Sequence, residues 1–341
     1  MPDIFLLVIS LIVILASAEM FTNGIEVVGS RLALSQAVVG SILAAIGTAM
    51  PETILPFVAI LFYGGEAGIN IAVGAILGAP FMLATLAFFL IGVSASAGYF
   101  FKRRKFELNI ELHNIKRDLI FFVLMYGSAI SLPLLFHESR LILAAGLVIA
   151  YFYYAYLTFH DESGYIAQFD ELYFKKLFSL IGSSSAEMSK GIETGILMPL
   201  LQVLISISLM IGGAHFFVSG LESLSLSWSL NPLLFSLLVA PIATELPEKF
   251  NSVSWTLKGR DSLAVGNVTG AMVFQSAFPV SLGLLFTEWT ISGLALLSAA
   301  LALVSSLLLL ADILFRKRLS PFTVMTGGIL YLIYAAAIIF F

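Results

Sequence analysis

The sequence predicts an all-α membrane protein with ten transmembrane helices, arranged as two inverted-topology repeats of five helices each. Three observations lead to this prediction. Of the 341 residues, 60% are hydrophobic and only 11% are charged, whereas soluble domains carry about 25% charged residues. The chain also contains ten apolar runs of membrane-spanning length, and a short proline–glutamate motif occurs once in each half.

The apolar runs define the expected helices, because each is long enough to cross about 30 Å of hydrocarbon. The first run follows an N-terminus without a basic flank, which favours a first span over a cleaved signal. Only His137 and Glu138 separate the fourth run from the fifth, so these two helices should form a tight hairpin. The runs lie near residues 4–29, 36–62, 68–98, 118–136, 139–159, 194–222, 230–256, 262–286, 289–312 and 320–341.

The basic residues indicate how the chain is oriented, because cytoplasmic connections are enriched in Lys and Arg. With the N-terminus outside, all 17 Lys and Arg residues except Arg140 and Lys249 fall in the odd-numbered, cytoplasmic connections. Both termini are then outside, and we expect the cell membrane as the location. Since each half has an odd number of spans, the second half enters from the opposite side, which gives an inverted repeat.

The same count divides the chain into three parts. Residues 1–159 form the first five-helix repeat, residues 160–193 a cytoplasmic linker, and residues 194–341 the second five-helix repeat. The linker is interpreted as an amphipathic surface helix with a connecting segment, in preference to a regulatory ion site. It is too short to be a separate domain of ordinary size.

A five-residue pattern occurs twice, 196 residues apart and each time inside an apolar run. Charged residues at membrane depth are energetically costly and usually functional. A duplicated carboxylate beside a broken helix is typical of an ion site at a repeat interface. The alternative is a pair of kinked helices with carboxylates at the membrane surface. The two copies are Thr48-Ala49-Met50-Pro51-Glu52 and Thr244-Glu245-Leu246-Pro247-Glu248.

Each motif supplies oxygen atoms of several kinds. Proline has no backbone N–H, so each motif proline frees the carbonyl four residues before it. The motif threonine lies one helical turn before the glutamate and can share its face. Hard cations such as Ca²⁺ bind carboxylate and carbonyl oxygens, and two carboxylates match a divalent charge. The expected cation ligands are Glu52, Glu248, Thr48, Thr244, Gly47 and Ala243, with Glu52 and Glu248 binding the metal directly.

A second element also recurs, as residues 74–79 and 266–271. Its glycines, spaced four apart, let helices approach closely. Asn267 places a polar amide within an apolar run. Two interpretations of this residue stay open, a cation ligand and a structural hydrogen bonder.

Together the two elements resemble the alpha repeats of the calcium/cation antiporter superfamily, the sodium/calcium exchanger-like membrane proteins. The resemblance covers nearly the whole chain. It implies that the two motif glutamates are central cation ligands, that the motif threonines add oxygens, and that transport proceeds by alternating access. The family's Gly-Thr-Ser-x-Pro-Glu and Gly-Asn-x-x-Gly-Ser-like elements correspond to residues 47–52 and 243–248, and to residues 74–79 and 266–271, respectively.

This chain departs from the family pattern at several positions. Ala49 and Glu245 replace the usual serine, and Ala75 replaces the usual asparagine or acid. Because serine oxygens help to form sodium sites in the family, Na⁺ and H⁺ both stay open as the coupling ion. Lys249 lies four residues after Glu245, so the two can form an ion pair. Either this pair is structural, or Lys249 occupies a cation subsite and replaces one driving ion.

Two further residues could modulate transport. Glu19 lies within the first expected helix, and its counterpart in the second repeat is His215. A carboxylate and an imidazole could transfer a proton, although a lone intramembrane histidine is more often structural.

The predicted function is therefore secondary antiport of Ca²⁺ against Na⁺ or H⁺. The alternatives are a cation channel, or an exchanger of another divalent ion such as Mg²⁺ or Mn²⁺ with altered coupling. We do not expect an enzyme, because no intramembrane His-Glu-x-x-His or Gly-x-Ser-x-Gly motif is present. The sequence implies no cofactor, no nucleic acid and no protein partner, only membrane lipids and the transported cations.

Overall fold

The computed structural model describes residues 2–32, 47, 49–102, 104–161, 172–174 and 195–340, and all regular elements within them are helical. Eight of the described helices are long and apolar enough to cross a membrane, and two shorter apolar helical segments, Met50–Tyr63 and Pro232–Ile242, accompany them. The all-helical fold and its apolar helices agree with an integral membrane protein. Most of the linker expected at residues 160–193 lies outside the described residues.

The first half contains a long first helix, a short broken segment, one very long helix and a hairpin. The short connection at residues 136–139 joins α6 to α7, which confirms the expected hairpin. Pro80 lies inside α4, three residues before the π-helical turn η3. The elements are α1 (Pro2–Arg31), α3 (Met50–Val58), η2 (Ala59–Tyr63), α4 (Gly65–Met82), η3 (Leu83–Ala87), α5 (Phe88–Phe100), α6 (Leu112–Leu135), η4 (His137–Ser139) and α7 (Arg140–Asp161).

The second half has a similar order. The apolar run expected at residues 230–256 consists of two helices that meet at Glu245. Asn231 caps the first of them by accepting hydrogen bonds from two backbone N–H groups. The elements are α10 (Leu197–Ser227), α11 (Pro232–Thr244), α12 (Leu246–Leu257), α13 (Asp261–Phe286), α14 (Gly293–Arg316) and α15 (Pro321–Phe340).

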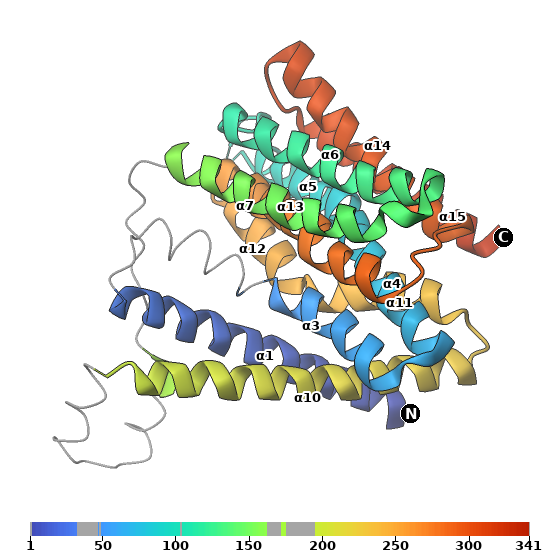
Figure 1. The fold of residues 1–341 in the computed structure, drawn as a ribbon. Helices are drawn as coiled ribbons and strands as arrows, with labels where there is room; N and C mark the ends of the chain where they lie inside the picture. Colours follow the sequence, from blue (N-terminus) through green and yellow to red (C-terminus); the bar gives the residue numbers. More distant parts are fainter. Residues whose placement is uncertain are drawn as a thin grey trace.

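The first helices of the two halves, α1 and α10, lie side by side and run in opposite directions (Figure 1). Gly24, late in α1, packs against Val203, early in α10. Its counterpart Gly220, late in α10, packs against Leu7, early in α1. The absence of a side chain at both glycines allows this close approach. Two ends of the described chain, residues 2 and 340, lie on the same side of the helix bundle, the right side of Figure 1.

Helices α4 and α11 also cross at glycines. A Cβ atom at Gly74 would overlap the carbonyl oxygen of Leu233, and one at Gly78 would overlap that of Leu237. The glycines of the first copy are therefore needed for packing. Within the described residues, Gly266 and Gly270 of the second copy face only distant side-chain atoms, which lie 3.9 Å from where a Cβ atom would be.

Buried apolar side chains form two clusters. One joins α1, α3 and α10 to the facing surfaces of α4 and α11, and includes Ile14, Leu55 and Phe217. The larger cluster contains side chains from helices α4 through α7 and from helices α13 through α15. It includes Phe81, Phe122 and Val273. The short helices α3 and α11 thus lie where the α1–α10 pair meets the remaining helices.

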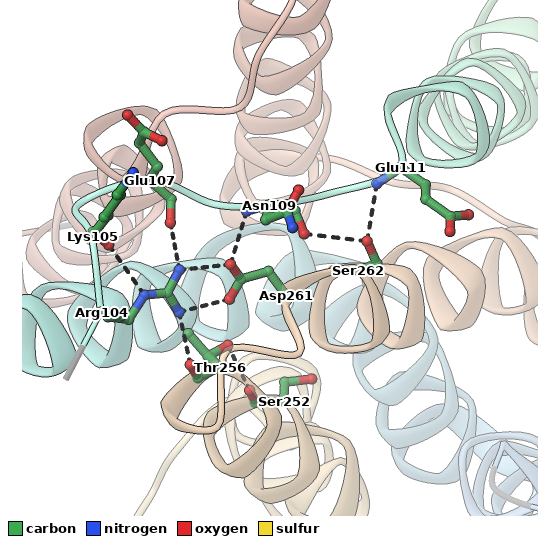
Figure 2. A network of polar contacts seen from close by, with 9 residues as sticks. All are labelled: Arg104, Lys105, Glu107, Asn109, Glu111, Ser252, Thr256, Asp261 and Ser262. Carbon is green, nitrogen blue, oxygen red and sulfur yellow. Dashed lines mark hydrogen bonds and ion pairs between the residues drawn. The ribbon is translucent and has the colours of Figure 1, made fainter.

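A polar clasp joins the connection between α5 and α6 to the turn between α12 and α13 (Figure 2). The guanidinium of Arg104 donates to both carboxylate oxygens of Asp261, at 2.7 and 2.6 Å. The same guanidinium donates to the backbone carbonyl of Thr256 at 2.7 Å, and Asp261 also accepts from the backbone N–H of Asn109 at 2.9 Å. Bidentate pairs of this kind are strong and directional, so the clasp fixes the ends of α12 and α13.

Candidate cation-binding site

The two proline–glutamate motifs break the backbone at equivalent points. Ala49, directly before α3, has φ −91° and ψ 8°, and Glu245, between α11 and α12, has φ −93° and ψ 12°. Each motif proline follows in the first turn of the new helix, where a missing N–H costs no hydrogen bond. A helix therefore begins within each motif, α3 at Met50 and α12 at Leu246.

The motif glutamates lie in the first turns of these new helices. Glu52 and Glu248 are only 5% and 4% exposed. Both carboxylate oxygens of Glu52 and Oε2 of Glu248 are buried and lack a hydrogen-bond partner among the described residues. The carboxylates of Glu52 and Glu248 are close enough for their charges to repel each other. The positive end of each helix dipole favours these carboxylates, but buried polar atoms without partners are costly. Their oxygens are thus available to a cation.

A buried ion pair lies beside the second motif. Lys249 Nζ lies 3.0 Å from Glu245 Oε2 and donates to the backbone carbonyl of Pro241, also at 3.0 Å. Glu245 Oε1 accepts a hydrogen bond from Gln275 Nε2 of α13 at 3.3 Å. Glu245 is fully buried, and Lys249 and Gln275 are 6% and 1% exposed. The spacing along the sequence thus correctly predicted the Glu245–Lys249 pair.

Asn267 connects α13 to α12. Its Nδ2 donates to the backbone carbonyl of Glu248 at 3.3 Å and to Ser252 Oγ at 3.4 Å. The amide nitrogen therefore has a structural role next to Glu248. The amide oxygen is the atom that could act as a ligand, so the two interpretations of this residue are compatible.

The remaining expected ligands lie near the two breaks. Thr244 is 3% exposed, and its hydroxyl donates to the carbonyl of Ala240 at 3.2 Å. Ala243 is the second-last residue of α11. Gly47 packs so closely on Thr22 of α1 that a Cβ atom would overlap its side chain. Thr48 lies outside the described residues.

A cavity of about 200 Å³ reaches both breaks. Its lining includes Pro51 of the first motif and Thr244 and Pro247 of the second. Glu19 and Glu26 of α1 line it as well. The cavity therefore links the two motifs to acidic side chains on the first helix, and it provides space for hydrated cations to approach.

Glu19 and His215 are not brought together. Glu19 accepts a hydrogen bond from the hydroxyl of Tyr173 at 2.8 Å, at the cavity. The ring of His215 lies against those of Tyr63 and Phe62, with centroid distances of 5.1 and 6.1 Å. Because α1 and α10 are antiparallel, equivalent positions on the two helices lie at different heights. The two side chains therefore have separate surroundings, and a role of either one in proton transfer stays a prediction.

Sequence reasoning missed several polar residues around the site. Gln275 and Ser252 both contact it. The buried acid Asp118 of α6, which no hydrogen bond between described residues joins to the site residues, was missed too; it accepts from Thr269 Oγ1 of α13 at 2.7 Å and from the hydroxyl of Tyr154 at 3.0 Å. The available signal was a polar side chain within an apolar helix. In the described part of the chain, no three His, Cys, Asp or Glu side chains form a group that could hold a metal. A cation at the motif glutamates would thus also need carbonyl, hydroxyl or water oxygens.

Comparison with known proteins agrees with these motifs. The profile of the sodium/calcium exchanger protein family matches residues 3–160 and 198–341. The chain belongs to the sodium/calcium exchanger family. The resemblance inferred from the two motifs is thereby confirmed, and this exchanger is a member of a family of transporters.

Two relatives match most of the exchanger. The putative antiporter CaxA of Alkalimonas amylolytica is 24% identical over 294 residues, which cover 86% of this chain and 83% of the relative. Inner membrane protein YrbG of Escherichia coli (strain K12) is 23% identical over 290 residues, which cover 85% of this chain and 82% of the relative.

Solved structures share the fold of this exchanger. The H⁺/Ca²⁺ exchanger CAX has a TM-score of 0.71 at 18% identity, with 100% of this chain and 86% of that chain covered. The sodium-calcium exchanger NCX_Mj has a TM-score of 0.58 at 18% identity, with 98% of both chains covered. The helical arrangement described above is therefore the exchanger fold.

Proposed function

We propose that this exchanger moves Ca²⁺ across the membrane against Na⁺ or H⁺ by alternating access, with Glu52 and Glu248 as the central ligands. The observation that carries the proposal is the set of buried, unpartnered glutamate oxygens in the first turns of α3 and α12. Ca²⁺ prefers six to eight oxygen ligands. Thr48, Thr244, Asn267 and the carbonyls of Gly47 and Ala243 are the proposed sources of further oxygens.

The charges around the breaks support a divalent cargo. Glu52, Glu245 and Glu248 contribute three negative charges when ionised, and Lys249 contributes one positive charge. The sum is −3 + 1 = −2, which one divalent ion balances. The carboxylate oxygens and the absence of cysteine favour a hard ion such as Ca²⁺ over soft metals.

We also propose ten membrane crossings, with residues 1–159 and 194–341 as inverted repeats and residues 160–193 as the cytoplasmic connection. Support comes from the antiparallel pairing of α1 and α10 and from their equivalent glycine contacts. The distribution of Lys and Arg supports a location of both termini outside the cell membrane. Glu19 and Glu26 are then in the cytoplasmic half of α1, and the cavity represents access from the cytoplasm.

The direct test is ⁴⁵Ca²⁺ uptake into proteoliposomes under an imposed Na⁺ gradient and, separately, an imposed H⁺ gradient. We expect saturable uptake that requires one of these counter-ions. Uptake that does not saturate and needs no counter-ion would instead establish a channel. Competition by excess Mg²⁺ or Mn²⁺ identifies the preferred divalent ion.

The coupling ion is expected to be H⁺, or Na⁺ at reduced stoichiometry. Ala49 and Ala75 provide no side-chain oxygen where the family pattern has polar residues. The similar folds include an exchanger of each kind, H⁺/Ca²⁺ and sodium-calcium. The two separate gradients therefore decide between them.

A further inference from the structure

We propose that the ammonium group of Lys249 is a tethered cation, which permanently fills a monovalent-cation subsite beside the Ca²⁺ ligands. This inference rests on the proposed function, because it concerns ion selectivity at the same site. The ammonium group of Lys249 thus excludes Na⁺ from a position that would otherwise bind a Na⁺ ion.

The surroundings of Lys249 Nζ are those of a hard cation. The carbonyl oxygen of Pro241 and Oε2 of Glu245 each lie 3.0 Å from it. Gln275 Oε1 is buried and has no hydrogen-bond partner among the described residues. The nitrogen of the same amide group contacts Glu245. Without the ammonium, a carboxylate oxygen and a carbonyl oxygen would remain close together, with the Gln275 amide beside the carboxylate. Oxygen ligands of these kinds suit hard cations.

The position of Lys249 ties it to the Ca²⁺ ligands. Glu52 and Glu248 both lie within electrostatic range of its charge. With Lys249 present, its charge and the charges of the three ionised glutamates, Glu52, Glu245 and Glu248, sum to −2. Removal of the lysine changes the sum to −3, which one Ca²⁺ and one monovalent cation would balance together. The side chain thereby sets how many ions the site needs.

The first repeat shows that the fold does not require this ion pair. Ala49 stands at the position equivalent to Glu245, and Thr53 at the position equivalent to Lys249, both at an offset of 196 residues. Thr53 donates to the carbonyl of Ala49 at 3.2 Å. Ala49 and Glu245 nevertheless have nearly the same backbone dihedral angles. A neutral pair thus forms the same break.

Stability alone is also a weak reason for a buried ion pair. Replacement of such pairs by neutral, well-packed residues is often neutral or stabilising. The pair occurs only in the second repeat, and its lysine binds a backbone carbonyl in addition to the glutamate. A selectivity role accounts for the pair, for the carbonyl contact and for the difference between the repeats.

The test compares Na⁺ binding by wild-type protein, Lys249→Thr, Lys249→Met and the double variant Glu245→Ala/Lys249→Thr. The double variant copies the first-repeat residues and is the matched control, because it removes the glutamate ligand together with the lysine. Thermal unfolding of each purified protein is followed in detergent at increasing NaCl, with choline chloride keeping the ionic strength constant. This measurement involves no Ca²⁺ flux, so its failure is distinguishable from failure of Ca²⁺ transport.

We expect Na⁺ to raise the unfolding temperature of the two single variants more than that of the wild type and of the double variant. At a Na⁺ concentration ten times the Kd, the additional bound Na⁺ should raise the unfolding temperature by about 2–4 °C. Two outcomes would overturn the proposal. One is a folded single variant that Na⁺ stabilises no more than it stabilises the wild type. The other is failure of both single variants to fold at any Na⁺ concentration while the double variant folds, since Lys249 would then only neutralise Glu245.

Discussion

Ala49 and Glu245 adopt the same non-helical backbone conformation at equivalent positions in the two halves of the chain. Their φ angles differ by 2° (−91° and −93°) and their ψ angles by 4° (8° and 12°). One residue is a small apolar side chain and the other a buried carboxylate. The break is therefore a property of the motif backbone and its proline, and it does not depend on the side chain at this position.

Neutralisation of either motif glutamate should abolish transport. Glu52→Gln and Glu248→Gln keep the shape of the side chain but remove a charge that a divalent ion needs. We expect at least about a tenfold loss of ⁴⁵Ca²⁺ uptake in each variant, with unchanged elution in size-exclusion chromatography. Glu66→Gln, at an exposed position in the first turn of α4, is the control and should transport normally. Near-normal uptake by either motif variant would remove that residue from the site.

Asn267 should contribute to both stability and ion affinity. Asn267→Ala removes its hydrogen bonds to Glu248 O and Ser252 Oγ, and also its amide oxygen. Ser252→Ala removes one of these hydrogen bonds and leaves the amide in place. We expect each variant to lose about 1 kcal/mol of stability, and only Asn267→Ala to need a higher Ca²⁺ concentration for half-maximal uptake. Equal Ca²⁺ dependence in the two variants would restrict Asn267 to its structural role.

Gly78 should tolerate no side chain. A Cβ atom there would overlap the carbonyl oxygen of Leu237, which is backbone and cannot rotate away. We expect Gly78→Ala to lower the stability by about 1–3 kcal/mol, measured as a lower unfolding temperature in detergent. Gly212→Ala in α10 is the matched control, because no atom lies within 4 Å of its Cβ position. Alanine favours helix formation over glycine, so the control should be at least as stable as the wild type.

The clasp in Figure 2 should stabilise the protein more than an exposed ion pair does. Arg104→Gln leaves the carboxylate of Asp261, whose side chain is 1% exposed, without its cation. We expect a loss of about 3 kcal/mol. In the control Arg316→Gln, the arginine side chain is 64% exposed, and the buried Asp312 keeps its hydrogen bonds from Ser320 N and Thr323 Oγ1. The loss there should be less than about 1 kcal/mol. Equal shifts of the unfolding temperature in the two variants would contradict this prediction.

The sequence by itself determined the features that depend on local chemistry. Apolar runs of sufficient length become helices, so the membrane class and the helices within the described residues could be predicted. Proline cannot donate a backbone hydrogen bond, so the two breaks and the positions of Glu52 and Glu248 could be predicted. The i,i+4 spacing likewise gave the Glu245–Lys249 pair, because residues so spaced lie on neighbouring turns.

Only the tertiary structure decided which side chains from different helices meet. Gln275 of α13 contacts Glu245, and Asn267 of α13 contacts the backbone of Glu248. These contacts depend on the rotation and height of each helix, which periodicity within one helix does not specify. The antiparallel packing of α1 on α10 likewise places Glu19 and His215 at different heights, although they are equivalent in sequence. Packing between helices, set by close contacts at residues such as Gly24, Gly78 and Gly220, therefore determines which polar groups surround the candidate cation site.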